Sequence, residues 1–359
     1  MMSYDNITLV SRKISKTIHR NGDTRATLVP GHLILDIPMI ASPMPDVCNG
    51  RMARTLAEKG VLGIIHRFQS IDSQVDEFIL GSTGKFNKIR VGCAIGVTGD
   101  YLERFNALYK EGCRVFCLDT ANGANIQVGD AILKIRGAIT PIPPIREIYK
   151  YSANLISKEY QDLSAAAIIL IAGNVMSAEG YEYLQDKVEA VRVSIAGGSV
   201  CETRTETGIH MPTLESVCEC IDVREAILTH NSKATPAAII ADGGIRTPAD
   251  MCKALAVGAD AVMCGSIFAG TSEAPGDVLM MEDRQKKKLY RGAASFSVQR
   301  DSNPDREIMY NEGRESFVDY KGSVEKILKR YQAGLQSSMS YADATNLREY
   351  RDNIEVLTL

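Results

Sequence analysis

Apolar residues along this chain gather in eight short runs, in which they follow one another almost without interruption. The runs are rich in β-branched residues and lie at 37–42, 61–66, 89–96, 115–121, 166–175, 190–197, 237–244 and 261–270. A run that is apolar throughout, rather than alternating with polar residues, is typical of a parallel strand buried on both faces. The pattern therefore predicts eight buried parallel strands.

Amphipathic segments separate these runs. Those at 49–60, 100–112 and 247–258 carry apolar residues at helical spacing and end at glycine, which commonly terminates a helix. Strand–helix units in series predict an α/β fold, here a (β/α)8 TIM barrel in a single domain spanning 1–359. An open doubly wound sheet is the alternative, but no G-x-G-x-x-G motif follows the first run.

Two stretches break the alternation of runs and helices. Residues 138–164 lengthen the connection between the fourth and fifth runs, and we interpret them as a surface insertion that offers a contact surface. Residues 288–322 follow the eighth run and are polar and rich in turn formers. Because long connections in compact domains are usually functional or disordered, we interpret 288–322 as an active-site flap segment.

Composition narrows the class of protein. The chain has 359 residues, of which 45% are hydrophobic, and a net charge of −3, so we expect neither a nucleic-acid nor a membrane partner. It contains no apolar run long enough to span a bilayer and no signal-peptide pattern. Its nine cysteines include no C-x-x-C pair, which argues against structural zinc and favours a reducing, cytoplasmic location.

Several predicted strands end in polar or glycine-rich segments, and in a barrel these carboxyl ends meet at one face. Gly243 and Gly244 are the last residues of the seventh run, and Gly265 and Ser266 interrupt the eighth. Backbone N–H groups at these two positions commonly bind phosphate in such barrels. Asp242, at the end of the seventh run, either binds the hydroxyls of a ribose or caps a helix.

Cys201 lies in the loop "AGGSVCETRTETG" (196–208), beyond the sixth run. Backbone N–H groups of a tight loop and the nearby Arg204 favour the thiolate, so Cys201 is a candidate nucleophile. The alternative is a packed thiol. Thr203 either positions a water or leaving group or makes ordinary loop hydrogen bonds. Glu312 is a candidate general acid or base if its loop covers the barrel mouth, and otherwise a solvated side chain.

Together these motifs resemble the inosine monophosphate dehydrogenase / guanosine monophosphate reductase family. The similarity runs nearly from end to end, through "YDNITLVSRK", "GGSVCETR", "ADGGIRTPADMCKALAVGADAVMCGS", "YRG", "EGRESFVDYKGSVEKI" and "AGLQSSMSYADATNL". Several motifs in one order make the resemblance specific. It implies a (β/α)8 barrel, usually a homotetramer, in which a cysteine attacks C2 of a purine nucleoside monophosphate and a nicotinamide cofactor exchanges hydride there.

The resemblance also implies roles for individual residues. The catalytic group is Cys201, Thr203 and Glu312. The nucleotide would be bound by Met44, Ser199, Asp242, Gly243, Gly244, Gly265, Ser266, Tyr290, Gly292 and Gly313. The cofactor would lie near Asp119, Asn122, Gly123 and Arg314. Potassium would be held by the backbone carbonyls of Ala196, Gly198 and Cys201.

Two features favour the reductase branch. The segment after the second run continues without the inserted regulatory (CBS) domains that are typical of the dehydrogenase, and residues 300–311 form a flap of nearly reductase length. The resemblance then implies NADPH-dependent reductive deamination of GMP to IMP and ammonia. NAD-dependent oxidation of IMP to XMP, and a purine-nucleotide-binding barrel without catalysis, are the alternatives. Ala293, where the family carries methionine beside the base, leaves a related purine nucleotide open as the substrate.

Overall fold

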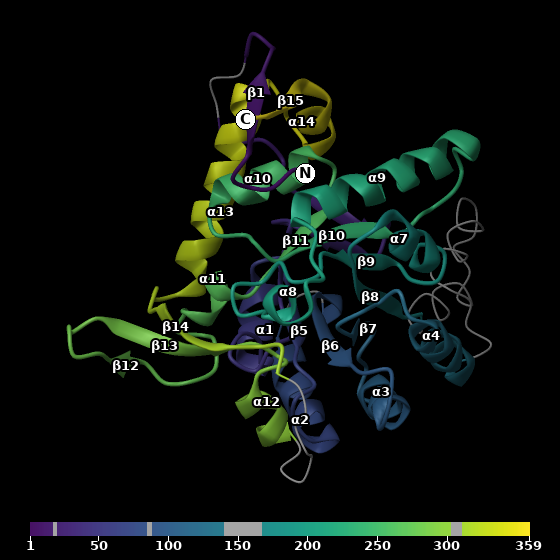
Figure 1. Ribbon diagram of the computed structural model, residues 1–359, viewed down its shortest axis with the longest axis vertical. Helices are drawn as coiled ribbons and strands as arrows, with labels where there is room; N and C mark the ends of the chain where they lie inside the picture. Colours follow the sequence, from purple (N-terminus) through teal and green to yellow (C-terminus); the bar gives the residue numbers. More distant parts are fainter. Residues whose placement is uncertain (17–19, 85–87, 140–166, 303–310) are drawn as a thin grey trace.

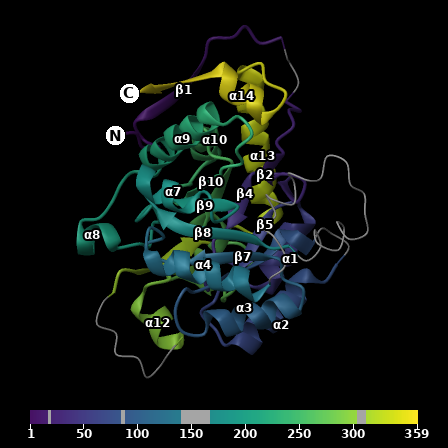
Figure 2. The ribbon, with the colours of Figure 1, turned by 90° about the vertical axis from the view of Figure 1, so that its right-hand side faces the viewer.

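Parallel strands close into a barrel at the centre of the molecule (Figures 1 and 2). In chain order they are β4 (Met39–Ala41), β5 (Leu62–Ile65), β6 (Val91–Ile95), β7 (Val115–Asp119), β8 (Ile169–Val175), β9 (Ala190–Val193), β10 (Ala238–Asp242) and β11 (Ala261–Cys264), and β11 pairs with β4 to close the ring. Each predicted run contains one of these strands, so the TIM-barrel prediction is confirmed. The computed structural model describes residues 1–16, 20–84, 88–139, 167–302 and 311–359.

The strands contribute to two apolar clusters because successive side chains point to opposite faces. One cluster contains barrel residues such as Ile40, Leu62 and Ile64 and apolar side chains of the hairpin strands β2 (Ala26–Val29) and β3 (Leu33–Leu35). Among the described residues, no buried member of this cluster belongs to a helix. The other takes the intervening positions and the buried faces of the helices. The first cluster therefore fills the barrel, and the second joins the barrel to its helical layer.

Helices surround the barrel and connect its strands. They are α1 (Gly50–Glu58), α2 (Ile71–Ser82), α3 (Tyr101–Lys110), α4 (Ile126–Ala138), α7 (Ala178–Leu184), α9 (Thr213–His230), α10 (Pro248–Ala256) and α13 (Val324–Tyr341). The helices predicted at 49–60, 100–112 and 247–258 are α1, α3 and α10. Local chemistry explains α10, because Thr247 and Asp250 form a reciprocal capping box and Pro248 occupies the first turn.

The connection between β5 and β6 spans residues 66–90 and holds α2 and a short 3-10 helix, Lys88–Arg90. The predicted absence of an inserted regulatory domain there is confirmed. The proposed insertion at 138–164 lies almost entirely outside the described residues, since α4 ends at Ala138 and the description resumes at residue 167.

An antiparallel sheet projects from the barrel after its last strand (Figure 1). It is formed by β12 (Leu279–Met280), β13 (Lys286–Arg291) and β14 (Glu315–Asp319), and α12 (Phe296–Ser302) lies between β13 and β14 in sequence. The predicted flap segment, 288–322, therefore contains most of β13, α12 and β14. Its residues 303–310 lie outside the described chain.

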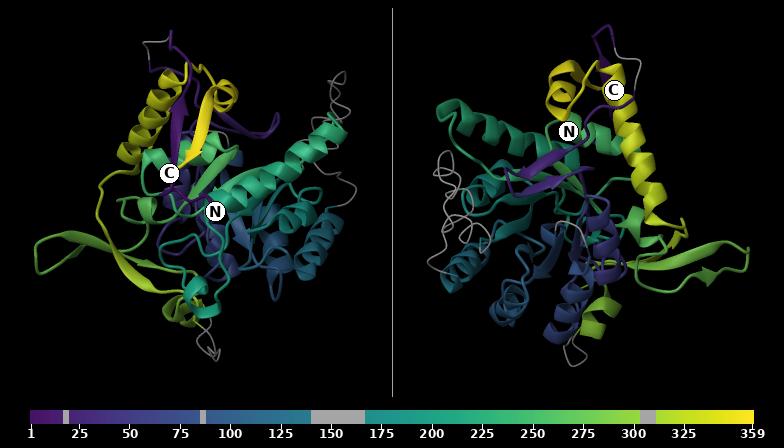
Figure 3. Two further views of the ribbon diagram at one scale, coloured as in Figure 1. Left: turned by 45° about the horizontal axis from the view of Figure 1, so that its top comes forward. Right: turned by 180° about the vertical axis from the view of Figure 1, so that it is seen from behind.

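The two ends of the chain are paired with each other. β1 (Ile7–Ser11) runs antiparallel to β15 (Ile354–Thr358), which follows α14 (Leu347–Asn353), as the purple and yellow strands in Figure 3 show. No helix in the described ranges combines the length and the apolar character that a bilayer crossing requires.

Candidate active site

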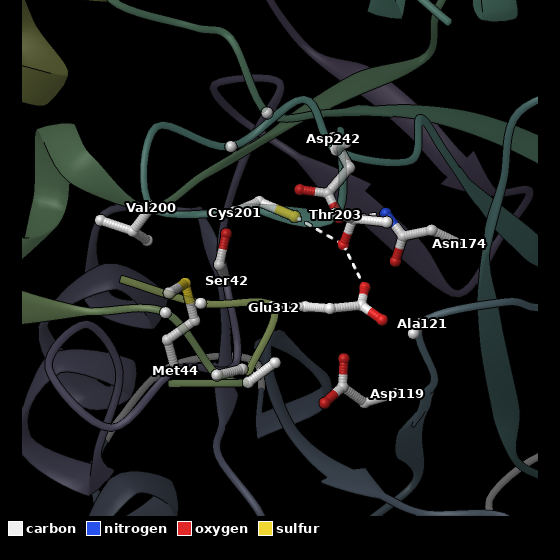
Figure 4. Close-up of a pocket in the computed structure, with 18 of the residues that line it drawn as sticks. Ser42, Met44, Asp119, Ala121, Asn174, Val200, Cys201, Thr203, Asp242 and Glu312 are labelled. Carbon is white, nitrogen blue, oxygen red and sulfur yellow. Dashed lines mark hydrogen bonds between the residues drawn. The ribbon is translucent and has the colours of Figure 1, made fainter. Parts of the chain in front are cut away.

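A cavity of about 420 Å³ opens at the carboxyl ends of the barrel strands (Figure 4). Its lining comes from the carboxyl ends of β4, β5, β7, β8, β9, β10 and β11 and the segments that follow them, together with residues between 290 and 299 and at 312–313. Glycine-rich strand ends and the segment beyond the last strand therefore converge on one pocket, as the sequence predicts for a barrel of this kind.

Most of the predicted site residues line this cavity. They are Met44, Asp119, Ala196, Gly198, Cys201, Thr203, Asp242, Gly243, Gly265, Tyr290, Gly292, Glu312 and Gly313. Six others lie outside the lining: Ser199, Gly244, Ser266, Asn122, Gly123 and Arg314. The side chain of Asn122 accepts a hydrogen bond from the amide of Ala124 at 3.1 Å, and the amide of Gly123 donates to the carbonyl of Asn174 at 2.7 Å. These two residues therefore shape the loop after β7 rather than the cavity wall.

Cys201 is half-buried and faces the cavity. Its sulfur lies 3.2 Å from Thr203 Oγ1, and that hydroxyl donates a 2.5 Å hydrogen bond to Glu312 Oε2 (Figure 4). The sequence left a packed thiol as the alternative for Cys201. The packed thiols are elsewhere: burial raises the pKa of Cys117 to about 11 and that of Cys264 well above its usual value.

A short antiparallel contact brings the two halves of this group together. Cys201 lies opposite Gly313, the amide of Glu202 donates to the carbonyl of Glu312 at 2.7 Å, and the amide of Arg314 donates to Val200 at 3.0 Å. On its other side, Gly313 lies beside Ser295. A Cβ on Gly313 would come within 2.5 Å of the Ser295 nitrogen, so only glycine permits this approach.

A buried arginine holds two carboxylates at the opposite wall. Arg192, in β9, lies 2.7 Å from a carboxylate oxygen of Asp119 and 2.9 Å from one of Asp242. The guanidinium of Arg67 lies 3.4 Å from the carboxylate of Asp119, and the side-chain amide of Asn174 donates a hydrogen bond to the carboxylate of Asp242 at 2.8 Å. Burial opposes ionisation of Asp119, but the charges of Arg192 and Arg67 outweigh it and leave the pKa of Asp119 below its ordinary value.

Arg192, Arg67 and Asn174 were not among the predicted site residues. Arg192 carried a usable signal, because an arginine inside an otherwise apolar strand is costly unless it is paired. For Asp242 the structure excludes helix capping, whereas ribose binding stays a prediction. Its carboxylate is held by Arg192 and Asn174, and the following helix, α10, is capped by Thr247.

Backbone forms the surface between Cys201 and the ends of β10 and β11. Gly243 and Gly244 have φ values of 91° and 77°, which favour glycine, and a Cβ on Gly243 would approach the carbonyl carbon of Gly197 to 2.8 Å. Tyr290 closes this surface from β13 and is only 3% exposed, and burial raises the pKa of its phenol. The hydroxyl therefore stays protonated, and as a hydrogen-bond donor at the cavity wall it is suited to an anionic ligand.

The carbonyls predicted to hold potassium lie on the same loop. Ala196 has a φ of 61°, and the carbonyl of Gly198 accepts the amide of Cys201 at 3.2 Å. Backbone carbonyls are ligands that potassium uses, so the donors fit the ion. Within the described residues, His, Cys, Asp and Glu side chains form no group of three suited to a metal ion. The potassium site stays a prediction.

Comparison with known proteins adds an independent observation. A family model described as "IMP dehydrogenase / GMP reductase domain" matches residues 1–146 and 150–359. An inosine-5'-monophosphate dehydrogenase of Borreliella burgdorferi is 27% identical, over 98% of this chain and 92% of its own length. Those of Nitrosopumilus maritimus and Streptococcus pyogenes are 36% and 30% identical, over 77% and 94% of this chain. The chain spans only 53% and 60% of the lengths of these last two relatives.

Proposed function

The chain belongs to the IMP dehydrogenase / GMP reductase family, and from this premise we propose that it is an NADPH-dependent GMP reductase. Its substrate would be GMP or a closely related purine nucleoside monophosphate, and its products IMP and ammonia. The observation that carries the proposal is the chain of contacts from the thiol of Cys201 through the hydroxyl of Thr203 to the carboxyl group of Glu312.

This chain of contacts suits a substitution at C2 of a purine. The thiolate of Cys201 adds to C2 and forms a carbon–sulfur bond. Glu312 supplies a proton that Thr203 passes to the departing amino group, the C2–nitrogen bond breaks, and ammonia leaves. The nucleotide then remains attached to Cys201.

The bound nicotinamide cofactor supplies a hydride to C2 of this attached nucleotide. The carbon–sulfur bond then breaks, its electron pair returns to the sulfur of Cys201, and IMP is released. What the chain itself contributes is placement: the thiol, the hydroxyl and the carboxyl group lie in one line of contacts at the cavity wall.

Two further groups of cavity residues would bind the phosphate and the ribose of the nucleotide. The backbone at Gly243 and Gly265 and the hydroxyl of Tyr290 would bind the phosphate. Asp242 would accept hydrogen bonds from the ribose, since Arg192 and Asn174 fix its carboxylate in one orientation. The cofactor would lie on the Asp119 side of the cavity. We further propose that the protein is a homotetramer and that potassium binds the carbonyls of Ala196, Gly198 and Cys201.

IMP dehydrogenase is the second candidate, and the names of the relatives favour it. That reaction would use the same thiol at C2 but pass hydride from the nucleotide to NAD, after which water would release XMP. The arginine and tyrosine that activate this water in the dehydrogenase are expected on the flap. Residues 305–307 read Asp-Arg-Glu, without the tyrosine, and lie outside the described residues.

Two matched assays decide between the candidates. Purified protein is mixed with GMP and NADPH, or with IMP and NAD, while absorbance at 340 nm is followed in potassium-containing buffer. We expect loss of NADPH with GMP, accompanied by ammonia. Production of NADH from IMP with no reaction of GMP would make the protein a dehydrogenase. Calorimetry on the same sample tests the third candidate, a purine-nucleotide-binding barrel without catalysis. Tight binding of GMP or IMP, with no turnover in either assay, would support that candidate.

A further inference from the structure

Arg314 follows the Glu312–Gly313 pair, yet its side chain turns back to the cysteine loop. The guanidinium donates two hydrogen bonds to the carbonyl of Ser199, from Nε at 3.0 Å and from one terminal nitrogen at 2.7 Å. The same guanidinium lies 3.3 Å from the carboxylate of Glu202. One side chain therefore contacts the loop on both sides of Cys201.

These contacts add to backbone pairing that already fixes the register of the loop. Val200 and Glu202 are hydrogen-bonded to Arg314 and Glu312 through the main chain, but these bonds leave the carbonyl of Ser199 unconstrained. The side chain of Arg314 constrains that carbonyl. A guanidinium is suited to this role because its donors are rigidly spaced and it stays charged at any accessible pH.

The pair is too exposed to act mainly through stability. The side chain of Arg314 is 59% exposed and that of Glu202 is 27% exposed, and ion pairs in such surroundings contribute little to folding. A contact of this kind affects the conformation of a short loop more than the free energy of unfolding of the whole domain. Its value therefore lies in where it holds Cys201.

We propose that Arg314 is a positioning residue, which keeps the cysteine loop in the conformation that aligns Cys201 with Thr203, and that Glu202 orients the guanidinium. This differs from the role near the cofactor that family resemblance implies for Arg314. Its consequence for turnover rests on the proposed function, whereas its consequence for the reactivity of the thiol does not.

The test measures the thiol directly, in the absence of nucleotide and cofactor. Wild-type protein and the variants Arg314→Ala, Arg314→Lys and Glu202→Gln are alkylated with iodoacetamide across a range of pH, and modification of the peptide that contains Cys201 is followed by mass spectrometry. Arg12→Ala is the matched control, because the Arg12 side chain is also mostly exposed, at 68% against 59% for Arg314, and pairs with Glu355 at 2.6 Å near the paired termini. Melting temperatures confirm that each variant is folded.

We expect Arg314→Ala to lower the alkylation rate of Cys201 at pH 7 severalfold, because the loop no longer holds the thiol toward the cavity. Arg314→Lys should show a similar loss together with loss of turnover, since lysine cannot hold the carbonyl with two donors. Low millimolar guanidinium should restore the alkylation rate of Arg314→Ala, and Glu202→Gln should show a smaller loss. Arg12→Ala should match the wild type.

An alkylation rate of Cys201 in Arg314→Ala equal to that of the wild type across the pH range would overturn the proposal. So would a variant whose only defect is a higher KM for the nicotinamide cofactor at unchanged kcat, because that result would assign Arg314 to cofactor binding. A protein that turns over no purine nucleotide at all would refute the proposed function, while the alkylation profiles would still decide the role of Arg314.

Discussion

Thr203 lies between the thiol of Cys201 and the carboxyl group of Glu312 and makes contact with both. A hydroxyl can accept a proton on one side and donate one on the other, so a residue of this kind in this place can carry a proton to a leaving group.

The first prediction removes this proton path without removing the nucleophile. Glu312→Gln and Thr203→Val keep the shape of their side chains but cannot transfer the proton, so we expect each to lower kcat by about 10²–10⁴-fold. Alkylation of Cys201 should persist in both variants. The double variant should lose little more than either single one, because the two residues act as one unit. Additive losses, measured by steady-state kinetics, would contradict the shared path.

Arg192 supports a second prediction, on stability. Replacing it with alanine leaves Asp119 and Asp242 without their shared cation, and losing one partner of a buried ion pair costs about 3–5 kcal/mol. We expect urea denaturation to show a loss of this size for Arg192→Ala. A loss below about 1 kcal/mol would mean that water already screens the pair.

The ion pairs of Asp119 also predict how the free energy of unfolding depends on pH. The pKa of Asp119 is lowered in the folded protein, so its pairing contributes fully above the unfolded value, near 3.9, and is lost as the pH falls through the lower folded value. Part of the acid destabilisation below about pH 4 should therefore disappear in Asp119→Asn. Parallel acid-unfolding curves for the variant and the wild type would argue against it.

At the scale of elements, the strands were predictable and the contacts between distant loops were not. The runs that became β4 to β11 are apolar throughout because both faces of each strand are buried, and this pattern is local. The contact between Cys201 and Gly313 is not local: Thr203 and Glu312, which it brings together, are 109 residues apart. Family resemblance placed Glu312 at the site, but not the pairing that holds it there.

Gly313 gives the prediction at this scale. A methyl group on Gly313 would collide with the backbone of Ser295, so Gly313→Ala should push the 312–314 segment away from the cysteine loop. We expect a large loss of kcat with a melting temperature close to that of the wild type, because the segment lies at the surface of the barrel rather than in its core. Gly137→Ala is the matched control, since a Cβ at Gly137 meets nothing within 4 Å and its backbone is helical. Equal kcat in the two variants would contradict this role for the 312–314 pairing.

At the scale of the whole molecule, the barrel explains why residues from seven strand ends share one cavity. Sequence reasoning reached the fold because the order of strands and helices in a barrel repeats the order along the chain. It did not reach Arg67, whose partner Asp119 ends a strand two places along the barrel and is 52 residues away in sequence, so the pair leaves no local pattern. It also left the base open, because Ala293 and Ala294 form part of the cavity wall and small side chains carry little information about the ligand.

The central claim is that Cys201 forms a bond to C2 of a purine nucleotide, and mass spectrometry of a quenched reaction tests it most directly. Wild-type protein turning over GMP with NADPH is quenched in acid, digested and analysed beside Cys201→Ser. We expect the mass of a nucleotide without its 2-amino group on the peptide that contains Cys201, and neither this mass nor turnover in the serine variant, whose hydroxyl does not ionise near neutral pH. Turnover by Cys201→Ser at the wild-type rate, or a nucleotide adduct on any other residue, would contradict the account.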